Sequence, residues 1–208
     1  WLGYVDREDS IETLQKTAAW AYQRGNAARA VELFQEAAKR CRRPGILSNL
    51  GAALRAAGRL EEAEAAYREA IARAPDFPNA HGNLGNLLAA RGRQAEAEAA
   101  LRRAHALAPN DPQVLRSLGL CLMRQLKATE AEAMLRKAAA LLPDDSDIHD
   151  NLAQLLRQKG EPVAASEIYA RLGDRMAHNW RAIGNRALLL QDLSRYVESE
   201  ALFRRALA

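Results

Sequence analysis

Residues 49–75, NLGAALRAAGRLEEAEAAYREAIARAP, decide the organisation of the whole chain. In the first half of this stretch, the apolar residues Leu50 and Leu54 stand on either side of Gly51, and Gly58 marks a turn. In the second half, the large residue Tyr67 stands between the small residues Ala63 and Ala70, and Pro75 closes the unit. The frame returns after 34 residues, and again after 34 more: Leu84, Gly85, Leu88, Gly92, Ala97, Leu101, Ala104 and Pro109, then Leu118, Gly119, Leu122, Leu126, Ala131, Leu135, Ala138 and Pro143. A fixed period of this length is typical of stacked supersecondary units, none of which can bury its apolar face alone.

This pattern resembles the tetratricopeptide repeat, a pair of antiparallel helices, over nearly the whole chain. An alanine-rich helical bundle would not keep glycine, alanine, the large residue and proline in phase over five repeats. The resemblance implies an all-α fold, an α-solenoid of about six helix-turn-helix repeats wound as a right-handed superhelix with a concave groove. We expect a lead-in at 1–10 and one solenoid over 11–208, with repeats at about 11–43, 44–77, 78–111, 112–145, 146–179 and 180–208.

Each recurring residue type has a physical role in this arrangement. We expect the glycines at 51, 85 and 119 to let the first helix approach the alanines of the second helix at 63, 97 and 131, where a larger side chain would overpack the contact. The large residue (67, 101 and 135) is expected to fill the space between the second helix and the following repeat. The prolines end the second helix, because a proline in a helix interior is unfavourable by about 3 kcal/mol.

The two ends of the chain are less regular. Ser10 is predicted to be the N-cap of the first helix, and residues 1–5 either pack on the first repeat or belong to an upstream one. The fifth repeat is expected to lose its second helix near Leu172, because Gly173 follows. The sixth repeat can be read in two frames, and we prefer the strict period over one with a three-residue insertion after Trp180, since it keeps the large residue in phase up to Phe203.

Composition limits the classes of protein. The net charge is +4, but 30 basic residues are interleaved with 26 acidic ones, so we expect no nucleic-acid partner. No run approaches the about 20 apolar residues that a membrane span requires. The two cysteines, Cys41 and Cys121, lie in repeats too far apart for a disulfide. The chain begins at Trp1, and we expect a piece of a longer protein, cytoplasmic or periplasmic.

No grouping of residues predicts catalysis, a cofactor or a metal. The glycines stand singly, so no phosphate-binding loop is formed. His81 and His149 share a repeat position but lie two repeats apart, without a recurring ligand beside them, and we expect packed or solvated histidines. We therefore predict that the chain is not an enzyme.

One polar position recurs within the first helix of the repeats. Its residues, which we call the ladder, are Asn49, Asn83, Ser117, Asn151 and Asn185. Asparagine is a mediocre helix former, so its return every 34 residues needs a reason. The resemblance places this position on the concave face, like the asparagine ladder of the O-linked N-acetylglucosamine transferase repeats. The amides then bind the main chain of an extended peptide, or alternatively form bonds within the stack.

A second set of side chains is expected to face the same groove and is mainly basic. It comprises Arg55, Arg116, Arg124 and Arg157, with Asn86, Gln154 and Gln158, while Asp147, Asp150 and Asp192 lie towards the C-terminal end. A basic groove favours an acidic or C-terminal-carboxylate ligand held by guanidinium groups. The lysine and paired asparagines of the family's chaperone-tail clamp have no counterparts here, so a heat-shock-protein tail is not the expected ligand.

Three functions follow as hypotheses. The first is a protein-interaction scaffold that holds an extended peptide or partner helix in the groove. The second is the substrate-docking arm of a larger enzyme such as a glycosyltransferase. The third, based on the alanine- and arginine-rich composition, is a scaffold of a bacterial secretion or polysaccharide-export complex. We also expect end-to-end self-association through Leu202, Phe203 and Leu207, since an uncovered apolar flank favours an interface.

Overall fold

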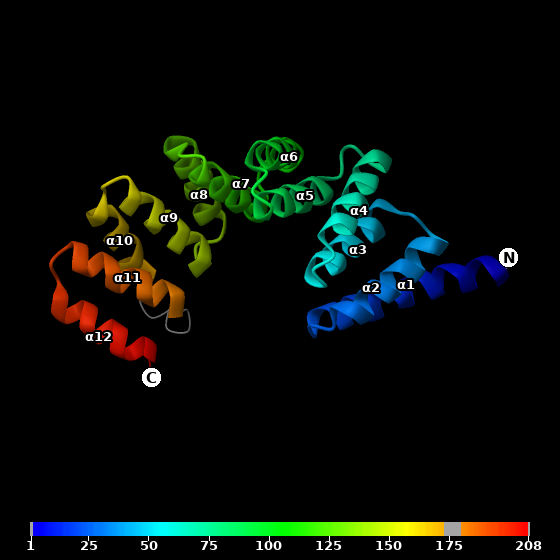
Figure 1. The fold of residues 1–208 in the computed structure, drawn as a ribbon, viewed down its shortest axis with the longest axis horizontal. Helices are drawn as coiled ribbons and strands as arrows, with labels where there is room; N and C mark the ends of the chain where they lie inside the picture. The colour runs from blue at the N-terminus through cyan, green and yellow to red at the C-terminus, as the bar shows by residue number, and fades with distance from the viewer. Residues whose placement is uncertain (1, 173–179, 208) are drawn as a thin grey trace. The chain divides into compact units, whose positions relative to one another are not determined.

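The computed structural model describes residues 2–172 and 180–207, and their side chains over 10–169 and 183–204. These residues form twelve α-helices and no strand (Figure 1). The helices are α1 (Leu2–Gln23), α2 (Ala27–Arg40), α3 (Pro44–Ala56), α4 (Leu60–Arg73), α5 (Pro78–Ala90), α6 (Gln94–Leu107), α7 (Pro112–Arg124), α8 (Ala128–Leu141), α9 (Ser146–Gln158), α10 (Pro162–Leu172), α11 (Trp180–Asp192) and α12 (Tyr196–Leu207). We call the odd-numbered helix of each pair helix A and the even-numbered one helix B.

The chain divides into two compact units, Trp1–Ala108 and Pro109–Ala208, here called the N-terminal and C-terminal units. Within each unit, every helix packs against the next one along the chain. Neighbouring helices A are also in contact, α3 with α5 in the N-terminal unit, and α9 with both α7 and α11 in the C-terminal unit. This is the packing of an α-solenoid, and the predicted all-α fold class is confirmed.

A proline follows the C-terminal end of three of the helices B. Helix α4 ends at Arg73, two residues before Pro75, and α6 and α8 end two residues before Pro109 and Pro143 in the same way. The residue before each proline has left the helical region, as at Ala74 with φ −141° and ψ 89°, because proline disfavours that region for the residue before it. The described part of α10 extends to Leu172. Both the early helix end expected there and the irregular junction expected at 173–179 depend on residues outside the described ones.

The turn between helices A and B uses a left-handed residue at a constant spacing. Residues 58, 92, 126, 160 and 194 all have positive φ, and they are Gly58, Gly92, Leu126, Gly160 and Ser194. The series has no slip up to Ser194, which agrees with the strict 34-residue frame in the last helix pair. The frame also explains Ser199, which stands where earlier helices B carry a buried alanine. It is fully buried, and its hydroxyl donates to the Ala187 carbonyl at 2.8 Å.

The recurring glycine of helix A lies against the large residue of its own helix B. A Cβ added at Gly85 would lie 2.6 Å from Leu101 Cγ and 3.1 Å from the carbonyl oxygen of Ala97. At Gly51 the nearest atom is Cε1 of Tyr67, at 2.5 Å. The close approach is confirmed, but its main partner is the large residue rather than the alanine. The large side chain lies across the glycine of its own pair, and its expected contact with the following repeat stays a prediction.

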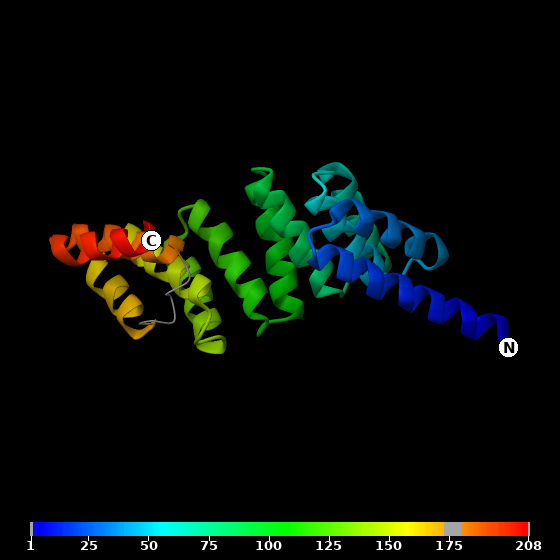
Figure 2. The same ribbon diagram turned by 90° about the horizontal axis from the view of Figure 1, so that it is seen from below.

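The first helix is longer than predicted. Helix α1 begins at Leu2 and extends past the end of α2 (Figure 2), so Ser10 lies inside it and is not its N-cap. The Ser10 hydroxyl accepts a hydrogen bond from Arg40 of α2. A serine is tolerated inside a helix when its hydroxyl bonds elsewhere than to the local backbone, and here that partner is a neighbouring helix.

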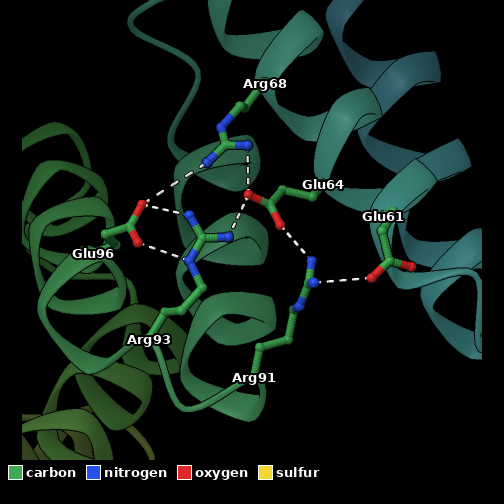
Figure 3. A network of polar contacts seen from close by, with 6 residues as sticks. All are labelled: Glu61, Glu64, Arg68, Arg91, Arg93 and Glu96. Carbon is green, nitrogen blue, oxygen red and sulfur yellow. Dashed lines mark hydrogen bonds and ion pairs between the residues drawn. The ribbon is translucent and has the colours of Figure 1, made fainter.

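An ion-pair network joins α4 to the turn between α5 and α6 (Figure 3). At its centre is Glu64, only 5% exposed, whose carboxylate accepts from Arg68 at 2.5 Å, Arg91 at 2.6 Å and Arg93 at 2.7 Å. Burial alone would raise the pKa of Glu64, but the Arg93 hydrogen bond and the three positive charges outweigh it and hold the pKa below its usual value. In the C-terminal unit Glu132 pairs with Lys159 at 2.6 Å, in the same repeat positions. The network is therefore a link between neighbouring repeats.

This lowered pKa predicts a pH dependence of stability. The carboxylate of Glu64 stabilises the folded chain above the unfolded-state pKa of about 4.3, and the contribution is lost as the pH falls through the lower folded-state pKa. We expect the wild-type chain to lose more stability than the Glu64→Gln variant between about pH 5 and pH 3. Urea unfolding at each pH gives the two curves, and parallel curves would contradict a role for Glu64.

Candidate functional site

The predicted site residues all lie on helices A. In the N-terminal unit, Asn49 and Arg55 are exposed on α3, and Asn83 and Asn86 are half-buried on α5. In the C-terminal unit, α7 carries half-buried Arg116 and Ser117 and exposed Arg124, α9 carries buried Asn151 and exposed Arg157, and α11 carries half-buried Asn185. Since neighbouring helices A are in contact within each unit, the structure gives each unit its own row of these side chains.

Two ladder amides form bonds between neighbouring repeats. Asn83 donates through Nδ2 to Ser48 Oγ at 3.2 Å, and Asn185 donates through Nδ2 to Asp150 at 3.1 and 3.2 Å. Both bonds join residues 35 apart, so each links a helix A to the preceding helix A. At these two positions the ladder asparagines therefore bond within the stack, which was the alternative to binding a peptide. A primary amide has a second N–H and a carbonyl oxygen, so one such bond leaves capacity for a ligand.

Asp150 is the centre of a buried polar cluster. Its side chain is 0% exposed and accepts from the Tyr169 hydroxyl at 2.7 Å, Gln154 Nε2 at 2.7 Å and Asn185 Nδ2. The sequence placed Asp150 and Gln154 in the groove, and for Asp150 that was wrong, because α10 and α11 cover it. Its role is to hold α9, α10 and α11 together by satisfying three donors with one carboxylate.

The four predicted arginines differ in what surrounds them. Arg157 is paired with Asp192 of α11, Nε to Oδ2 at 2.5 Å, and Arg124 already takes part in an interaction within the chain. Arg55 is exposed near the buried hydroxyl of Tyr67. Burial raises the pKa of Tyr67 to about 12, while the positive charge of Arg55 opposes this rise. Arg116 has a buried Nε with no hydrogen-bond partner among the described residues.

A small hollow of about 120 Å³ lies where α1, α2 and α3 meet in the N-terminal unit. Asn49 and Gln23 supply its polar wall, and Tyr22, Phe34, Ala19 and Ala52 line the rest. Of the predicted residues only Asn49 lines it. The sequence analysis missed Tyr22 and Gln23, because the first helix has no recognisable repeat frame from which to assign their face.

A larger hollow of about 580 Å³ lies in the C-terminal unit between α8, α9 and α10. Leu152 and Leu156 of α9 line it, and the small side chains of Ala139 and Ala140 leave room beside them. None of the predicted site residues lines this hollow. It is therefore separate from the row of helix-A side chains in the same unit.

Metal binding and membrane spanning find no support in the parts of the chain that the structure describes. They contain no group of three or more histidine, cysteine, aspartate or glutamate residues able to hold a metal ion. His81 contacts the carbonyl oxygen of Pro75 at 2.9 Å, and His149 contacts that of Asp145 at 2.8 Å. Both cysteines are free thiols. No described helix combines the length and the apolar character needed to cross a bilayer.

Comparison with known proteins identifies the class. Models of the tetratricopeptide repeat match residues 11–43, 54–121 and 116–175. The chain belongs to the tetratricopeptide-repeat family, whose fold is a scaffold for protein–protein interactions and whose members bind protein or peptide partners. No curated protein matches the sequence.

Solved structures of the same fold include several bacterial repeat proteins. One is pilF of Pseudomonas aeruginosa, with 21% identity and a TM-score of 0.82 over 94% of this chain and 89% of that one. Another is a tetratricopeptide-repeat protein of Thermus thermophilus, with 22% identity and a TM-score of 0.73 over 87% and 99%. A third is YrrB, described as having an unusual peptide-binding site, with 18% identity and a TM-score of 0.67 over 85% and 92%. At these identities the likeness establishes the fold alone.

Proposed function

We propose that the chain is an interaction scaffold that binds an extended peptide on the surfaces formed by its helices A. The hollow at Asn49 carries this proposal. Its wall offers two primary amides, each with two donors and one acceptor, which suit the N–H and C=O groups of a peptide main chain. Tyr22 and the buried Phe34 supply an apolar lining beside these amides, against which one apolar side chain of the peptide can pack. Binding sites commonly combine an apolar lining with a few polar groups. The proposal assigns the chain no reaction of its own.

A peptide-binding test separates the ligand role of the ladder from its structural role. A peptide array first supplies a binding peptide, and calorimetry then measures its affinity. Asn49→Ala removes an exposed amide, so we expect unchanged melting and about five- to tenfold weaker binding, the equivalent of one lost hydrogen bond. Asn185→Ala removes a donor to buried Asp150, so we expect a lower melting temperature.

Asn79→Ala is a matched control, since Asn79 is also exposed on a helix A but does not line the hollow. We expect both its melting and its affinity to equal those of the wild type. If Asn49→Ala binds the peptide as tightly as Asn79→Ala does, the hollow is not the peptide site.

The predicted acidic preference of the ligand depends on arginines without a carboxylate partner. Arg157 is paired with Asp192, which offsets its charge, and Arg124 is already engaged. The acidic-ligand hypothesis therefore rests on Arg55 in the N-terminal unit and Arg116 in the C-terminal unit.

The other hypotheses from the sequence stay predictions. A docking arm of a glycosyltransferase and a scaffold of an export complex both fit a repeat scaffold, and sequencing the complete gene would distinguish them. For self-association, Phe203 is half-buried on α12, while the side chain of Leu207 lies outside the described residues. Sedimentation of the purified chain tests that prediction.

A further inference from the structure

The acid that links neighbouring repeats through helix B is absent from the fifth repeat. The residues at this position are Glu64, Glu98, Glu132 and, on α10, Ser166. Glu64 and Glu132 each pair with a basic residue in the turn of the following helix pair. Ser166 keeps the position but has no carboxylate, so it cannot form this ion pair with the sixth repeat.

The basic partner, in contrast, is kept at that junction. Arg195, in the turn between α11 and α12, is the equivalent of Arg93, which Figure 3 shows. Arg93 donates through Nε and Nη2 to Glu96 at 2.7 and 2.6 Å, and through its remaining Nη1 to Glu64 at 2.7 Å. Arg195 donates through Nε and Nη2 to Glu198, both at 2.7 Å. Its Nη1 can therefore take a carboxylate from outside the chain while the other two bonds stay in place.

A hollow of about 340 Å³ lies at this junction, and both Ser166 and Arg195 line it. Val163 and Leu193 add an apolar lining, and Val163 is 63% exposed. Glu167 also lines the hollow, but it already takes part in an interaction within the chain. The hollow thus combines a cation with apolar side chains, at the repeat position where other junctions carry a carboxylate.

We propose that this hollow binds an aspartate or glutamate side chain of a partner protein, together with an apolar residue next to it. The carboxylate accepts from Nη1 of Arg195, as Glu64 accepts from Arg93, and the apolar residue packs against Val163 and Leu193. The lining residues belong to α10 and to the turn between α11 and α12, so none of them lies on a helix A. The surface is therefore a second one, beyond the peptide site proposed at Asn49.

Two short peptides test this surface directly, without a known partner. They are acetyl-Leu-Glu-Leu-amide and the neutral acetyl-Leu-Gln-Leu-amide. Nitrogen-15 NMR of the whole chain follows the Nε–H signal of Arg195, assigned by its absence from the Arg195→Lys variant. We expect a saturable shift with the acidic peptide and at least about fivefold weaker binding of the neutral one, the equivalent of one hydrogen bond to a charged group. An absent shift, or equal affinities for the two peptides, overturns the proposal.

Ser166→Glu supplies the missing acid within the chain. We expect it to form the link that Glu64 forms, and so to melt at a higher temperature than Ser166→Gln, whose helix propensity is similar. It should also abolish the shift with the acidic peptide, whereas Ser166→Ala should keep it. If Ser166→Glu melts no higher than Ser166→Gln, or binds the peptide as the wild type does, the hollow is not a carboxylate site.

Arg59 provides a matched control for the arginine. It holds Glu62 through the same two nitrogens, at 2.7 and 2.6 Å, but does not line this hollow. Its side chain is 42% exposed and that of Arg195 is 49% exposed, so the two substitutions to Met should lower the melting temperature alike. Backbone amide shifts should show at least about fivefold weaker binding of the acidic peptide to Arg195→Met, and unchanged binding to Arg59→Met. Equal losses would show a general effect of charge and overturn the site.

This inference and the proposed function fail separately. If an array peptide binds and Asn49→Ala weakens it, but the acidic peptide leaves Arg195 unshifted, the peptide function stands and the second surface is refuted. If Arg195 shifts and no array peptide depends on Asn49, the second surface stands alone. A shift of the Arg195 signal on concentrating the chain without peptide would identify a second copy as the occupant and overturn a separate partner.

Discussion

Asp150→Ala is expected to lower the free energy of unfolding of the C-terminal unit by about 3 kcal/mol. The substitution removes the common acceptor of Tyr169, Gln154 and Asn185. Tyr169 is only 2% exposed, so its hydroxyl cannot turn to water for a new partner. The unsatisfied buried hydroxyl costs about 1–3 kcal/mol, and the half-buried amides of Gln154 and Asn185 each lose a bond to a charged group. Urea unfolding followed by circular dichroism measures the loss.

Two further variants sharpen this experiment. Asp150→Asn keeps one acceptor oxygen, so we expect a loss smaller than that of the alanine variant. Asp192→Ala is the matched control, because Asp192 is also an acid bonded across to a neighbouring helix A but is 42% exposed. An exposed ion pair contributes less than about 1 kcal/mol. Equal losses for Asp150→Ala and Asp192→Ala would refute the role of the buried cluster.

Gly85→Leu is expected to lower the free energy of unfolding of the N-terminal unit by about 3 kcal/mol. Its Cβ alone would come within 2.6 Å of Leu101 and 3.1 Å of the backbone oxygen of Ala97, so both α5 and α6 must move apart. Overpacking of this kind costs about 1–3 kcal/mol, and the further atoms of leucine place this variant at the upper end. Thermal and urea unfolding give the magnitude.

Gly184 provides the matched control for that prediction. It also lies in a helix A, but a Cβ there meets no atom of the described residues within 4 Å. We expect Gly184→Leu to be neutral or stabilising by up to about 1 kcal/mol, since glycine is a poor helix former. The turn glycine Gly92 is a poor control, because its φ of +77° strains any side chain. A similar loss at residues 85 and 184 would mean that the close contact is not what makes leucine unfavourable.

The sequence was sufficient to predict the helix pairs and their ends. Apolar periodicity and proline act within a few residues, so they identified the helix ends before Pro75, Pro109 and Pro143. The glycine contact was found, but its partner was misassigned. The 34-residue period shows only that the glycine and its possible partners recur together. Which side chain lies over the glycine depends on how each helix is rotated about its own axis.

The candidate site was harder to predict, because its polar contacts depend on pairs and not on single positions. Asp150 resembled a solvated acid in the sequence, although it is fully buried under α10 and α11. Comparing residues 35 apart would have paired Asp150 with Asn185 and Arg157 with Asp192. That spacing is one repeat plus one residue, so a search at the repeat length misses it. The start of α1 was also missed, because Ser10 finds its partner on another helix.

The fixed spacings also restrict the order in which the repeats can stand. Contacts along helices A join residues 35 apart, and ion pairs at the helix-B side, such as Glu64 with Arg91 and Glu132 with Lys159, join residues 27 apart. The junction between the second and third repeats carries both kinds of bond, the fourth and fifth repeats share the ion pair, and the fifth and sixth share the helix-A bond. The repeats share one backbone plan, but the polar side chains at their junctions differ. Exchanging two repeats would therefore keep the helix pairs and change which junctions carry these bonds.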